Sequence, residues 1–189
     1  AVGDKPVIYD ATTNTLVLPS GRTRALNGDG IAPGASLQMA GPASSSVLLA
    51  TADSLVSVPL DGGAPTVTPA QEGSSIGGVP APPAFHQGCA YGAWTGSGAY
   101  MRACDDASAN KQMVVDTLTT ARDIVFRTNR KAIVLNDVAQ GSVWLPDSNM
   151  VLMDNWDEVE NQLEESEEEQ DSPELTNEVA DPQQREENT

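Results

Sequence analysis

Residues 88–104 read Gly88-Cys89-Ala90-Tyr91-Gly92-Ala93-Trp94-Thr95-Gly96-Ser97-Gly98-Ala99-Tyr100-Met101-Arg102-Ala103-Cys104, and this stretch decides the fold. Its Thr-Gly-Ser-Gly centre predicts a turn between two β-forming runs. If Trp94 lies opposite Ala99, Cys89 falls directly opposite Cys104. Opposed residues of antiparallel strands have Cβ atoms about 4.5–5.5 Å apart, close to the reach of a disulfide. We therefore predict a β-hairpin closed by a Cys89–Cys104 disulfide.

The predicted disulfide bears on the compartment of the protein. Disulfides persist in oxidising environments, so the mature protein is expected outside the cytoplasm, at the cell surface or beyond it. The alternative is two free, buried thiols in a cytosolic domain. The sequence has no apolar run of membrane-spanning length and no signal peptide at its start. Because it begins Ala1-Val2-Gly3-Asp4, without Met, we expect a piece of a larger protein, with any membrane anchor outside this chain.

Outward from the hairpin, residues 1–153 alternate short runs of Val, Thr, Ile and Leu with turn sequences such as Asn27-Gly28-Asp29-Gly30 and Asp61-Gly62-Gly63. This alternation is typical of an all-β fold, and no window before residue 150 has a sustained helical period. Besides the hairpin, the expected strands are 6–10, 15–18, 36–40, 46–52, 54–60, 65–68, 112–118, 123–127, 131–135 and 141–145.

A weak repeat narrows the architecture. Three segments, 46–63, 99–116 and 131–147, each read as strand, polar turn and strand, about forty to fifty residues apart. That spacing fits the four-stranded blades of a β-propeller. So few blades do not close a ring, so the others are expected upstream of Ala1 or from a partner. A β-sandwich is the alternative, since short, evenly spaced strands also permit it.

The charge of the chain is concentrated at its end. Of 27 Asp and Glu residues, fifteen lie in residues 151–189 beside one base, Arg185, so this segment carries −14 of the net −17. We divide the chain into an all-β body, 1–153, and an acidic helix and linker, 154–189. Met153, Trp156, Val159 and Leu163 have helical spacing, whereas the run Glu164–Glu169 favours an extended, solvated spacer.

Aromatic residues are scarce, and three of them lie on the hairpin. Tyr91, Trp94 and Tyr100, with the single histidine His86 just before it, are the candidate ligand-contacting residues, and a glycan-stacking platform is one role for them. In the predicted register Tyr91 shares a face with Cys89, and Trp94 takes the other. The competing interpretation makes all four core residues, because aromatics in so poor a core are usually structural.

No catalytic, metal or cofactor signature stands out. Gly73-Ser74-Ser75-Ile76-Gly77 matches a nucleophile pattern, but prolines 69, 80, 82 and 83 around it exclude the helix that this chemistry needs. One histidine and two disulfide-bonded cysteines do not make a zinc site, and no loop has calcium-ligand spacing. Nucleic acid is excluded as a partner because no basic stripe is present to neutralise phosphates.

The segment from Arg127 onward carries a family resemblance. Its Leu135-Asn136-Asp137, Trp144-Leu145-Pro146 and Asn155-Trp156-Asp157 resemble the passage that precedes tandem Ig-like and fibronectin type III repeats in large, membrane-anchored surface proteins of actinobacteria. The cysteine hairpin is similar too, and the resemblance covers roughly residues 80–160. It implies a propeller-like extracytoplasmic segment, joined by the acidic linker to Ig-like domains absent from this chain.

The expected function is a non-enzymatic surface scaffold or adhesion module. Its partners are neighbouring domains of the same polypeptide, with a host or cell-wall protein or a glycan as candidate ligands. The alternative is a fragment of a secreted hydrolase that uses Ser75 or His86.

Overall fold

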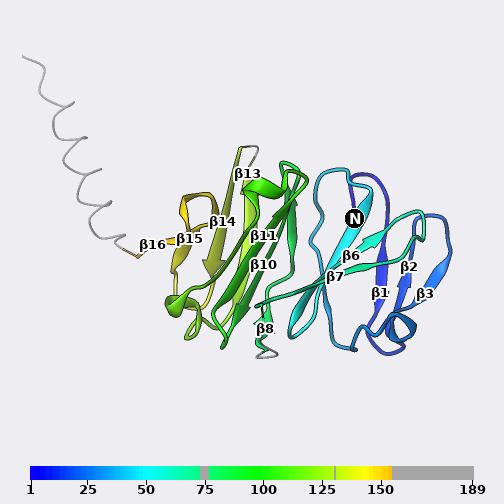
Figure 1. Ribbon diagram of the computed structural model, residues 1–189, viewed down its shortest axis with the longest axis horizontal. Coiled ribbons are helices and arrows are strands. Elements are labelled where there is room, and N and C mark those ends of the chain that lie inside the picture. The colour runs from blue at the N-terminus through cyan, green and yellow to red at the C-terminus, as the bar shows by residue number, and fades with distance from the viewer. Residues whose placement is uncertain (73–76, 130, 155–189) are drawn as a thin grey trace, which may run out of the picture. The chain divides into compact units, whose positions relative to one another are not determined.

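A computed structural model describes residues 1–72, 77–129 and 131–154 of the chain (Figure 1). They are built from β-strands and short 3-10 turns, so the predicted all-β class is confirmed. The chain divides after Asp154, and the residues Ala1–Asp154 form one compact unit. The predicted acidic helix and linker, Asp154 apart, lie outside the described residues.

Four antiparallel sheets follow one another along the chain (Figure 1). The first contains β1 (Ile8–Asp10), β2 (Thr15–Val17) and β3 (Thr23–Ala25). The second contains β4 (Ser36–Leu37), β5 (Ser46–Ala50), β6 (Ser54–Pro59) and β7 (Thr66–Pro69). The third contains β8 (Val79–Pro80), β9 (Ala84–His86), β10 (Cys89–Thr95), β11 (Ala99–Cys104) and β12 (Lys111–Val114). The fourth contains β13 (Ile124–Asn129), β14 (Ala132–Asp137), β15 (Val143–Leu145) and β16 (Val151–Met153).

Within each sheet the strands pair in chain order from one edge to the other, with β8 and β9 both beside β10. The described residues contain no closed sheet. Their helical turns are η1 (Leu26–Asp29), η2 (Ala107–Ala109), η3 (Asp116–Leu118) and η4 (Pro146–Ser148). Two sheets would make the β-sandwich that the sequence also permitted, whereas the described residues form four.

Successive sheets pack face to face through three apolar clusters. The first interface joins sheets one and two through Leu16, Val47, Leu49, Val56 and Val58. The second joins sheets two and three through Ala50, Leu55, Trp94, Ala99 and Met101. The third joins sheets three and four through Tyr91, Tyr100, Phe126, Leu135 and Trp144.

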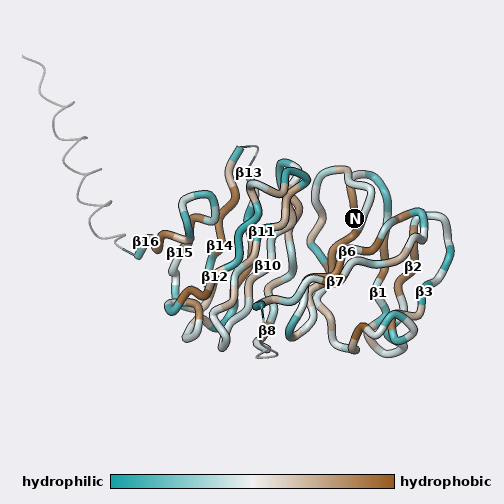
Figure 2. The backbone as a smooth tube through the Cα atoms, viewed as in Figure 1, coloured by the Kyte–Doolittle hydropathy of each residue, from teal (hydrophilic) through white to brown (hydrophobic). Residues whose placement is uncertain are grey.

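The middle sheets are therefore buried on both faces. In β5, Val47 and Leu49 contribute to the first interface while Ala50, on the opposite face, contributes to the second. Such strands read as near-continuous apolar runs because neither face meets water. Figure 2 shows brown, hydrophobic segments along strands such as β6 and β14, and teal at several of the turns between strands.

A buried carboxylate fixes the turn between β14 and β15. Asp137 is 1 % exposed and accepts hydrogen bonds from the backbone N–H groups of Arg122 (3.0 Å), Asp123 (3.3 Å) and Ala139 (2.9 Å). Desolvation raises the pKa of Asp137, but together its backbone hydrogen bonds, including one from Gln140, outweigh it and hold this pKa below its usual 3.8. The ionised form is thus the one that the folded chain stabilises.

The predicted repeat is confirmed as pairing: β5 with β6, β11 with β12, and β14 with β15 are antiparallel pairs in successive sheets. The prediction missed four short strands, which are β3, β8, β9 and β16. Met153, the last residue of the predicted all-β body, pairs with Val143 at the edge of the fourth sheet. The residues that continue its helical spacing, Trp156, Val159 and Leu163, are not among those described.

Candidate functional site

The predicted hairpin and its disulfide are confirmed. Cys89 pairs with Cys104 and Ala93 with Tyr100, the register expected from the turn. The two cysteines form a disulfide with an S–S distance of 2.04 Å and Cα atoms 3.9 Å apart. A disulfide of this kind is characteristic of oxidising compartments.

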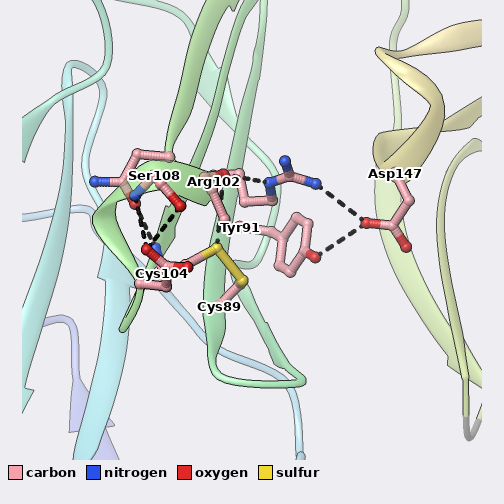
Figure 3. Close-up of a disulfide and its surroundings, with 9 residues drawn as sticks. Cys89, Tyr91, Arg102, Cys104, Ser108 and Asp147 are labelled. Carbon is pink, nitrogen blue, oxygen red and sulfur yellow. Dashed lines mark hydrogen bonds and ion pairs between the residues drawn. A yellow bond between two sulfur atoms is a disulfide. The ribbon is translucent and has the colours of Figure 1, made fainter.

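Beside the disulfide, a polar contact joins the third and fourth sheets (Figure 3). The Tyr91 hydroxyl donates to Asp147 Oδ1 at 3.3 Å, and Arg102 Nη1 lies 3.4 Å from the same oxygen. Burial and then the Asp147 carboxylate raise the pKa of Tyr91, so its hydroxyl stays protonated as a donor. The group therefore links the third sheet to the 3-10 turn that follows β15.

Trp94 and Tyr100 are core residues, which corrects their assignment as candidate ligand contacts. Both side chains are fully buried. Trp94 fills the second interface, where its Nε1 donates to the Thr51 backbone oxygen at 2.7 Å, and Tyr100 lies in the third. Tyr91 is 2 % exposed and packs against Phe126, with ring centroids 6.1 Å apart. The three aromatics cannot form a stacking platform, because each lies inside a sheet interface.

His86 is also buried, at 6 % exposure, on β9 opposite Cys89. Its Nε2 has no hydrogen-bond partner within the described part of the chain. The interpretation as a packing residue therefore fits its position better than ligand contact does.

The segment after β4, strand β9 and strand β13 border one small cavity. Its volume is about 170 Å³, and its walls are Met39–Gly41 after β4, Ala84 and Phe85 of β9, and Phe126–Thr128 of β13. The N-terminal segment lies next to this cavity, because Val2 forms an isolated β-bridge with Gly41 in its wall. Equivalent edges of three successive sheets thus border one space.

A larger opening lies elsewhere, between the second and third sheets, and we call it the hydroxyl cleft. Its volume is about 740 Å³. One wall comes from Ser44–Ser46, Leu48, Leu55, Ser57, Thr66 and Thr68, and the other from Phe85, Gly88, Ala90 and Ala103–Asp105. The sequence analysis did not predict this site; the local signal in the sequence is the alternation of Thr66 and Thr68 with Val67.

Among the described residues that line the cleft there is no Lys, Arg or His, and Asp105 is the one charged residue. Among the described residues, no three His, Cys, Asp or Glu side chains gather in a way that would hold a metal ion. Ser75, the serine of the nucleophile pattern, lies outside the described residues. The cleft is therefore suited to neutral polar groups rather than to acid–base or metal chemistry.

Across residues 1–72, 77–129 and 131–154, no helix is long and apolar enough to span a bilayer. Comparisons of the chain with protein-family models, with curated proteins and with solved structures found no match.

Proposed function

We propose that this chain is part of a β-propeller in a large cell-surface protein, where it acts as a non-enzymatic scaffold or adhesion module. The observation that carries the proposal is the stack itself. Successive antiparallel meanders of three to five strands pack face to face in chain order, as blades do.

The cavity at the first strands supports the same arrangement. In a propeller the blades are arranged around a central channel. Here the segment after β4, the start of β9 and the middle of β13 border one space, and each lies in or next to the first strand or strand pair of its sheet. A common axis along these edges accounts for that convergence.

Both ends of the stack support further blades. On the fourth sheet, Val134 and Val143 alternate with the buried Leu135 and Trp144, so they lie on the outer face, where they are half-buried. On the first sheet, Ile8 and Val17 lie opposite each other on the outer face, and Ile8 is 61 % exposed. Apolar sheet faces of this kind are suited to covering by another sheet.

The surface location rests on the disulfide and on the resemblance. Disulfides accumulate in exported proteins, and the resemblance places such a segment ahead of Ig-like repeats. The acidic run at the end of the chain suits a charged spacer between the propeller and those repeats.

Hydrogen exchange of this chain, alone and within a longer polypeptide that includes its natural flanking segments, tests the proposal. Covering by further blades should slow amide exchange in β14–β16 of the longer polypeptide. Val143→Asp should abolish that protection, whereas Val138→Asp, at an exposed turn position (51 % exposed), should leave it intact. Equal exchange in both polypeptides would show that the end face is not covered by neighbouring segments.

A further inference from the structure

We propose that the hydroxyl cleft binds a neutral, polyhydroxylated ligand, which is the chemistry of a short glycan. The inference deepens the proposed adhesion role and rests on it only for its biological setting. The binding site itself is argued from the residues of the second and third sheets.

The cleft exists because small residues face one another across part of the second interface. Stacked sheets lie about 10 Å apart, a gap that large side chains normally fill. On one half of the interface Trp94, Met101 and Leu55 fill it. On the other half Ala90 and Ala103, which pair with each other on the third sheet, leave the space open.

The opposite wall presents hydroxyl groups into this space. Ser57 pairs with Thr66, and Leu55 pairs with Thr68, so these side chains share the face of the second sheet that points to the third. Within the described part of the chain, the hydroxyls of Ser57, Thr66 and Thr68 make no hydrogen bond. Each hydroxyl can donate one hydrogen bond and accept two, so the wall has unused capacity for a ligand.

The lining selects among ligand classes. Anions are disfavoured because Asp105, the single charged group in the described lining, is itself negative. Leu48, Leu55 and the Ala methyl groups supply an apolar floor, and Phe85 supplies a ring for the C–H face of a sugar. An extended peptide would instead need the unpaired backbone of a strand edge, whereas this wall is a side-chain face.

The size of the cleft and its support agree with such a site. Its 740 Å³ lies within the range of about 300–1,000 Å³ typical of small-ligand pockets. Cys104 lines it, so the Cys89–Cys104 disulfide holds the end of the β10–β11 wall in place. A fixed wall reduces the ordering that a ligand must impose.

The test is titration of the chain with maltotriose, cellotriose and chitotriose, in which binding is measured by calorimetry and by NMR chemical-shift changes of cleft residues. Wild type should bind at least one of them, with shifts confined to the cleft. The double variant Ser57→Ala/Thr68→Val should weaken binding about tenfold, since two hydrogen bonds are lost. Ala90→Leu should abolish it by filling the cleft. Thr23→Val, at an exposed strand position on the outer face of the first sheet, is the matched control and should bind as wild type does.

Circular dichroism and thermal melting of each variant separate loss of the fold from loss of the site. Ser57→Ala alone serves where Ala90→Leu proves unstable, and it should still weaken binding severalfold. No binding of any neutral trisaccharide by wild type, binding insensitive to the cleft variants, or binding of acidic sugars or peptides alone would each overturn the proposal. None of these outcomes alters the hydrogen-exchange test, so the two proposals can fail separately.

Discussion

Replacing Trp94 and Trp144 by Phe, one at a time, probes how the buried tryptophans hold the sheets together. Each substitution removes the same atoms from a fully or almost fully buried side chain, so the packing losses are similar. The hydrogen bonds differ. Trp94 Nε1 donates to the buried backbone oxygen of Thr51 at 2.7 Å, whereas Trp144 Nε1 donates to the exposed Thr117 hydroxyl at 2.8 Å.

The magnitude follows from what each partner can do afterwards. The Thr51 oxygen would remain buried without a donor, which costs about 1–3 kcal/mol. The Thr117 hydroxyl can turn to water, so its loss costs only the net value of one bond, about 1 kcal/mol. We expect Trp94→Phe to reduce the free energy of unfolding by about 1 kcal/mol more than Trp144→Phe does. Urea denaturation of both variants, followed by far-ultraviolet circular dichroism, measures this difference. Equal losses, or a larger loss for Trp144→Phe, would refute the reasoning.

Three further predictions follow from the hairpin and the Asp137 turn. Replacing Cys89 and Cys104 together by Ala should lower the free energy of unfolding by about 3 kcal/mol, because the unfolded chain regains the conformational entropy of the closed loop. Mass spectrometry of unreduced peptides from the wild-type protein should show the linked pair. Gly92→Ala should cost about 1–3 kcal/mol, since the new Cβ would lie 2.7 Å from the indole two residues on, while Gly28→Ala, in open space, should change the melting temperature little. The pKa of Asp137 is lowered in the folded state, so its contribution to the free energy of unfolding is complete above pH 3.8, the usual pKa, and is lost as the pH falls through the folded pKa. Asp137→Asn should therefore flatten the dependence of unfolding free energy on pH in that acidic window. An unchanged pH dependence would contradict this role of Asp137.

Much of the third sheet could be predicted because the strand pairing of its hairpin is determined by residues close together in the sequence. The turn at 95–98 sets the register, and the register sets both the disulfide and the faces of Tyr91 and Trp94. The two-residue β8 and three-residue β9 were missed because the prolines between and around them resemble a loop. They nevertheless pair with β10, because their partner is supplied by the rest of the sheet.

The site was harder to predict than the fold. Aromatic residues drew the prediction to Trp94 and Tyr100, but a chain with so few large side chains uses them to fill its interfaces. The hydroxyl cleft depends on which residues face each other across two sheets, and Ala90 and Ser57 are far apart in sequence. The spacing of residues along the chain does not predict that these two residues face each other, because their proximity results from the packing of one sheet on another.

The double burial of the middle sheets has a consequence for how sequences with this arrangement diverge. In a sheet with one solvent-exposed face, polarity fixes the strand register, because a one-residue shift in register would expose the apolar side chains to water. In β5 or β10 a slip would instead exchange one interface for the other. What fixes the pairing is size, as where Gly92 leaves room for the Trp94 ring. Related sequences can therefore keep this stack of sheets while sharing few identical residues. The condition is that a substitution to a larger side chain is compensated by a smaller one in contact with it, and that other substitutions fall in the turns.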